Sequence, residues 1–99
     1  MGYDLHITKK DFWADEEGIV IQKEEWIKYV SSDPDISPDK NNTENDFLVK
    51  DGDTDWPIWY DPSLGEIYTK NPSDKAIKKL KIIANELNAK LQGDDGELY

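Results

Sequence analysis

Residues 71–87, which read NPSDKAIKKLKIIANEL, decide the fold class because they form the longest helical pattern in the chain. Asn71 suits the N-cap and Pro72 suits the first helical position. Asn88, just beyond, is expected to end the helix in the left-handed conformation. The apolar side chains that repeat on one face are Ile77, Leu80, Ile83, Ala84 and Leu87. A helix with a single apolar stripe must pack against another element.

Strand patterns lie on both sides of this helix. Apolar and polar residues alternate with the period of two that is typical of a half-buried strand. Pro57 favours an edge strand or the first position of a strand, because proline cannot donate a ladder hydrogen bond. The loop 61–65 has the length of a hairpin connection, so a three-stranded meander is expected. The predicted strands are residues 3–8, 47–49, 57–60, 66–70 and a short one that follows residues 89–91.

A first helix is predicted over residues 22–32, with Trp26 in the core, and residues 19–21 are either a short strand or its lead-in. Residues 33–46 contain two prolines and adjacent asparagines, so little backbone order is expected there, with Ile36 as the apolar anchor. Residues 1–99 are therefore expected to form a single α+β domain. Its antiparallel or mixed sheet has four or five short strands, and two helices pack on one face.

The composition excludes several classes of function. The chain has 22 acidic residues against 12 lysines, no arginine and no cysteine, and its net charge is -10. Nucleic acid is repelled, and the bidentate phosphate grip of arginine is missing. Disulfides, thiolate nucleophiles and cysteine-type zinc sites are ruled out. A run of about 18 apolar residues and a signal-peptide pattern are both missing, so we expect a cytoplasmic protein without a membrane partner.

Charge is unevenly distributed along the sequence. Residues 33–55 hold eight acids and two lysines, whereas residues 70–90 hold six lysines and two acids. One interpretation is that the basic helix lies beside the acidic segment and offsets its charge; the other is that each is a solvated face. Cationic partners are favoured in either case.

A polar cluster is conceivable where the chain ends meet. The C-terminal turn, residues 92–97, carries three carboxylates and two glycines, and the first strand carries the only histidine. Its spacing matches no known motif, and such a turn is more often a solvated hairpin. We therefore assign no catalytic residue, metal ligand or cofactor. The residues kept as a polar site, should the two terminal strands prove to be neighbours, are Asp4, His6, Gln92, Asp94, Asp95 and Glu97.

A calcium loop is suggested and then rejected at residues 51–62. Asp51, Asp53 and Asp55 imitate its first three ligands, but Trp56 and Pro62 occupy the positions that require glycine and glutamate.

The four tryptophans are more informative, because one small core cannot easily bury them all. Rings beside charged residues are typical of binding surfaces, although they also cap core edges. The predicted binding surface consists of Trp13, Asp53, Asp55, Trp56, Trp59 and Tyr60.

Several short motifs, spread nearly end to end, resemble a group of small bacterial proteins without an established activity. The motifs are YDLHIT at residues 3–8, EW at 25–26 with YV at 29–30 and DP at 33–34, WYD at 59–61, KNP at 70–72 and QGDDGE at 92–97. The resemblance implies a bacterial origin and a shared fold, and no catalytic role. This chain departs from the group at Gln22, where a serine or threonine cap is expected, and its middle segment is shorter.

The leading functional hypothesis is a small acidic binding or inhibitor protein of the immunity type, which neutralises a basic protein such as a toxin nuclease. Net charge would steer such a partner, and tryptophans would anchor it. The alternative is an enzyme with a metal-dependent or acid–base site at Asp4, His6, Asp94, Asp95 and Glu97. A structural module that acts as an oligomer is the third hypothesis, and the oligomeric state is left open.

Overall fold

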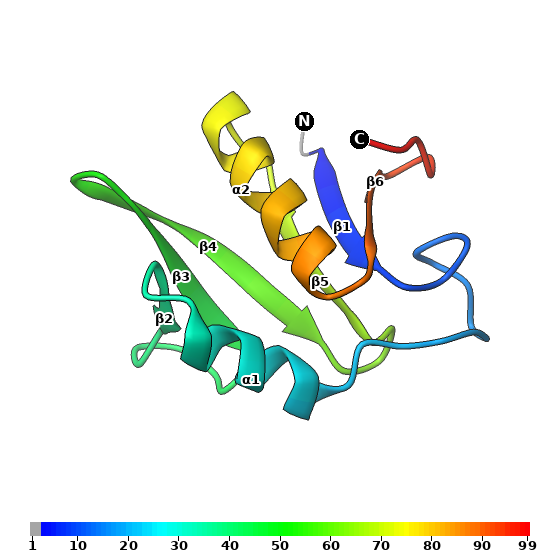
Figure 1. Ribbon diagram of the computed structural model, residues 1–99, viewed down its shortest axis with the longest axis horizontal. Helices are drawn as coiled ribbons and strands as arrows, with labels where there is room; N and C mark the ends of the chain where they lie inside the picture. Colours follow the sequence, from blue (N-terminus) through cyan, green and yellow to red (C-terminus); the bar gives the residue numbers. More distant parts are fainter. Residues whose placement is uncertain (1–2) are drawn as a thin grey trace.

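The computed structural model describes residues 3–99 and shows two helices in front of a six-stranded antiparallel sheet (Figure 1). The predicted α+β class is confirmed, and the sheet has one strand more than the upper limit expected. Neither helix in the described range is long and apolar enough to cross a membrane. The elements are β1 (Asp4–Thr8), α1 (Lys23–Ser32), β2 (Ile36–Pro38), β3 (Asp46–Asp51), β4 (Thr54–Asp61), β5 (Glu66–Lys70), α2 (Asp74–Glu86) and β6 (Lys90–Gly93).

The strand order β2-β3-β4-β5-β1-β6 places the first strand between two later ones. Strands β2 to β5 form a consecutive antiparallel meander, which extends the predicted three strands by one. β1 then pairs with β5 on one side and with β6 on the other. The start of β1 and the end of β6 consequently lie at the same end of the sheet (Figure 1).

Both helices cover one face of the sheet, as predicted. Leu5 and Ile7 point to this face from β1, and Leu80 and Ile83 of α2 belong to the same buried cluster. Trp26 of α1 is fully buried and meets the ring of Phe47 edge-on, with the ring centroids 5.5 Å apart. The residues that alternate with the core positions face the opposite side of the sheet. We call that helix-free side the open face.

The ends of α2 correct two predictions, the cap at Asn71 and the first helical position at Pro72, which lies before the helix, and confirm another. Ser73, rather than Asn71, is the N-cap, because its side chain accepts a hydrogen bond from the backbone of Ala76. Asn71 instead adopts a left-handed φ of 47° and accepts a hydrogen bond from the Tyr3 backbone. Asn88 takes the left-handed conformation expected after the helix, with φ of 55°.

The start of α1 is held from outside the helix. Gln22 is its N-cap and makes no side-chain capping bond. The preceding residue, Ile21, is a lead-in rather than a strand. Its backbone N–H donates a hydrogen bond to the Gly65 carbonyl, and its own carbonyl accepts one from the Tyr60 hydroxyl. Gly65 has φ of 64°, and a Cβ there would collide with Val20. Glycine at this turn is therefore what lets the lead-in approach the β4–β5 loop.

Two predictions were wrong, one about backbone order in residues 33–46 and one about the place of Pro57 in the sheet. Residues 33–46 are not structureless, because Ile36–Pro38 pairs with β3 as an edge strand; the expected anchor Ile36 is 5% exposed. Pro57 is neither on an edge strand nor first in its strand. In the described chain, however, β4 pairs with β5 only from Trp59 to Asp61, so the side of Pro57 that faces β5 needs no ladder donor.

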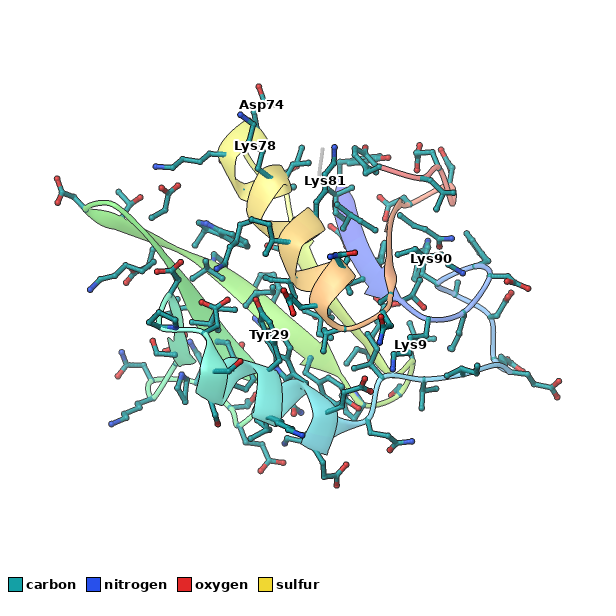
Figure 2. The ribbon with its side chains drawn as sticks, in the orientation of Figure 1. Lys9, Tyr29, Asp74, Lys78, Lys81 and Lys90 are labelled. Carbon is teal, nitrogen blue, oxygen red and sulfur yellow. The ribbon has the colours of Figure 1, made fainter. Side chains whose placement is uncertain are left out.

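The acidic segment and the basic helix do lie together. Lys79 of α2 pairs with Asp33, 2.8 Å away, and with Asp35, and Lys75 pairs with Asp51. Tyr29 points from α1 towards α2 and donates a hydrogen bond to Asp33 (Figure 2). Burial alone would raise the pKa of Asp33, but the hydrogen bonds from Lys79, Tyr29 and the Asp35 backbone outweigh it and lower the pKa below 3.8. This cluster joins the two helices.

Substitution of Ser73 tests the corrected helix start. We expect Ser73→Ala to lower the free energy of unfolding by about 1 kcal/mol, because the Ala76 N–H loses its acceptor. Urea denaturation measures the change. Ser63→Ala is the matched control at an exposed turn position and should leave stability unchanged. Equal stabilities for both variants would contradict the assignment of Ser73 as the cap.

Acid should weaken the junction between the helices through Asp33. Its pKa is lower in the folded protein than in the unfolded chain, so its contribution is complete above pH 3.8 and disappears as the pH falls through the folded-state pKa. We expect Asp33→Asn to be less stable than wild type at pH 7 and to lose less stability than wild type between pH 5 and about pH 2.5. Urea denaturation across that range provides the comparison, and parallel losses would contradict it.

Candidate functional site

A row of five directly opposed residues crosses the open face. Gln92 of β6 lies opposite His6 of β1, and His6 lies opposite Tyr68 of β5. Tyr68 lies opposite Trp59 of β4, which lies opposite Asp46 of β3. Three rings are consecutive in this row, with centroids 6.5 Å apart for His6 and Tyr68 and 5.2 Å apart for Tyr68 and Trp59. The open face is therefore aromatic along its middle.

His6 lies between two carboxylates and is only 3% exposed. Its Nδ1 is hydrogen-bonded to Glu66 Oε2 at 2.6 Å, and its Nε2 is hydrogen-bonded to Asp94 Oδ1 at 2.9 Å. Each ring nitrogen therefore has a carboxylate partner at hydrogen-bond distance. The side chain is held in a buried network of hydrogen bonds to acidic groups.

Burial and charge act on this network in opposite directions. Burial by itself would lower the pKa of His6, but hydrogen bonds with Glu66 and Asp94 outweigh it and raise the pKa above 6.5. Burial raises the pKa of Glu66, and His6 opposes that change. The bond from His6 lowers the pKa of Asp94, which is nearer the surface. The two carboxylates therefore favour the protonated form of the imidazole, against the effect of burial.

Trp13 covers the imidazole from the loop between β1 and α1. The two rings are parallel within 4°, with centroids 3.7 Å apart. The Trp13 indole N–H donates to the backbone oxygen of Asp94, and its backbone N–H donates to the Gln92 side chain. Gln92 in turn donates to the Asp11 backbone. The same loop is tied to β6 by Lys90, which donates to the Lys10 carbonyl (Figure 2).

The terminal strands are neighbours, as the predicted polar site requires, but only part of the expected set converges. Asp4 joins His6 and Asp94: one ligand-type atom from each lies within 4.8 Å of the others. Asp95 is exposed and stays outside the cluster. Glu97 turns towards Gly93, where a Cβ would collide with its carboxylate and with the Tyr3 hydroxyl.

Glu66 is the member of the cluster that sequence reasoning missed. It is 1% exposed, and its Oε1 is buried without a hydrogen-bond partner. The sequence offered one signal: Glu66 is an acid that alternates with the apolar Ile67, directly after the tight turn at Gly65. Only the pairing of β1 with β5 shows that His6 is within reach, since the two residues are 60 positions apart.

The six residues of the predicted binding surface do not share one surface. Trp56 and Tyr60 lie on the helix-bearing face, where Tyr60 is buried and Trp56 packs against the core. Asp53 is exposed in the turn between β3 and β4. Asp55 and Trp59 alternate with those core residues and therefore point to the open face. Trp13 lies over His6 at the other end of the row.

Glu66→Gln tests the ion pair at the centre of the cluster. The amide keeps a hydrogen-bond acceptor but removes the charge, so we expect the pKa of His6 to fall relative to wild type. Titration of the imidazole carbon-bound protons by NMR measures it. Asp55→Asn, an exposed carboxylate elsewhere on the open face, is the charge-matched control and should leave the titration unchanged. An unaltered His6 pKa in Glu66→Gln would contradict the proposed pairing.

A comparison with protein families, curated proteins and solved structures finds no match to this chain. The resemblance to the bacterial group described above stays a prediction, and functional inference rests on the geometry of the open face.

Proposed function

We propose that this chain is a small acidic binding protein whose open face docks a basic protein, in the manner of an immunity or inhibitor protein. The observation that carries the proposal is the pair formed by Trp59 and Tyr68. The two rings lie side by side at 5.2 Å and are only partly buried, on a sheet face that neither helix covers. Partly exposed large aromatic rings are the usual anchors of protein interfaces.

The surroundings of the pair favour a cationic partner. Strand alternation and register place Asp46, Asp55 and Asp61 on the same face as Trp59. Lys50 and Lys70 also point to this face, so its charge is acidic without being uniform. Arginine and lysine side chains can stack on the rings and pair with the carboxylates around them. The net charge of -10 would accelerate the encounter with such a partner.

The acidic segment 33–55 contributes less to docking than its charge suggests. Asp33 and Asp35 are paired with Lys79, and Asp51 is paired with Lys75. These carboxylates lie on the side of the helices and are already neutralised by α2. Within residues 3–99, open-face carboxylates that no salt bridge neutralises, such as exposed Asp55, are the ones available to a partner.

Binding assays with basic proteins encoded by neighbouring genes test this function. We expect a saturable interaction in calorimetry that weakens when the salt concentration rises from about 50 mM to about 500 mM. Trp59→Ala should weaken binding by about 30-fold, which corresponds to about 2 kcal/mol at an interface anchor. Asp55→Asn should weaken it less and should reduce the salt dependence.

Glu86→Gln is the matched control, because Glu86 is an exposed acid on α2, away from the open face. Its binding should equal that of wild type. Salt-independent binding, or equal losses for Asp55→Asn and Glu86→Gln, would contradict docking at the open face. The lack of binding by every basic candidate would contradict the function itself.

A further inference from the structure

We propose that Asp4, His6 and Asp94 bind one divalent transition-metal ion of the zinc class at the place where the chain ends meet. The proposal goes beyond the docking function and does not rest on it. Three potential ligand atoms, one from each side chain, lie within 4.8 Å of one another. Ligands of one ion at bond lengths of about 2.1 Å lie about 3 to 4 Å apart, so small side-chain rotations would complete the site.

The donor set selects the class of metal. Imidazole nitrogen suits Zn²⁺ and related transition metals, whereas Mg²⁺ and Ca²⁺ prefer sites made only of oxygen. His6 Nε2 already faces Asp94 Oδ1 at 2.9 Å, with a proton between them. On binding, the ion would take the place of that proton, which is released to solvent, and Nε2 would coordinate through its lone pair.

Glu66 supplies the independent observation that points to a ligand. Metal-binding histidines typically donate their second ring nitrogen to a carboxylate, which fixes the ring and makes the coordinating nitrogen more basic. Here Nδ1 donates to Glu66 at 2.6 Å, and Glu66 is almost fully buried with one oxygen unpartnered. This arrangement leaves Nε2 as the nitrogen directed at the two aspartates.

Charge and access are also suited to a cation. Asp4, Asp94 and Glu66 surround a single imidazole, and none of the salt bridges found within residues 3–99 joins a lysine to these three carboxylates. The Asp94 side chain is 38% exposed, so an ion can arrive from solvent and keep water in its remaining positions. Trp13 helps to fix two of these residues in place, because its ring stacks on His6 and its indole N–H donates a hydrogen bond to the Asp94 carbonyl.

Calorimetric titration of the full chain with ZnCl2, with MgCl2 as the comparison, tests the site. We expect one equivalent of Zn²⁺ to bind saturably and Mg²⁺ to bind at least 10-fold more weakly. Asp94→Asn should weaken Zn²⁺ binding at least 10-fold. Asp95→Asn removes the same charge one residue further on, outside the cluster, and should change the affinity less than twofold.

A measurement on the unaltered chain guards against misfolded variants. Zn²⁺ should shift the NMR resonance of His6 Nε2 far more than that of Nδ1, because Nε2 faces Asp94 whereas Nδ1 faces Glu66. Binding of several ions without saturation, equal losses for the two asparagine variants, or an imidazole whose nitrogens do not respond to Zn²⁺ would overturn the proposal.

Discussion

The pairing of β1 on both of its edges is the constraint on which the rest of the structure depends. This strand lies between β5 and β6, so residues from the start, the middle and the end of the chain lie side by side in one sheet. Its alternation then serves two purposes at once. Leu5 and Ile7 enter the core beneath α2, while His6 faces the opposite side. A slip of one residue would exchange these faces and bury the wrong set.

The buried His6 network is costly in a domain of this size. Removing an ionised group such as His6 or Glu66 from water costs several kcal/mol per ion, which mutual attraction returns only when the geometry is good. The distances of 2.6 and 2.9 Å meet that condition for His6, yet Glu66 Oε1 remains unpartnered. An apolar pair would fill the same positions without that penalty. The retained polarity therefore favours a role for the cluster beyond stability, and ion binding is such a role.

The sequence predicted those features that depend on local periodicity. The stripe of α2, the exact limits of β5 and the left-handed Asn88 all follow from short-range rules. Capping rules predicted Asn71 as the N-cap of α2, which was wrong: Ser73 is also a good capping residue, and the contact of Asn71 with Tyr3 is not visible in the sequence. The contacts around His6 were only partly predicted, for a similar reason. Its principal partner, Glu66, is 60 residues away, and only the order of strands brings the two together.

The two proposals use opposite ends of one row on the open face, and this separation makes them independent in practice. Tyr68 lies between His6, where the ion would bind, and Trp59, where the partner would dock. Asp55→Asn and Trp59→Ala change groups far along β4 from the metal ligands, and Asp94→Asn changes the turn after β6. A bound ion would nevertheless reduce the negative charge at its end of the face. The metal ion and the basic partner are both cations, so a bound ion would oppose docking of a partner that reaches His6 and leave unaffected one confined to Trp59. By linkage, such a partner would weaken metal binding to the same extent.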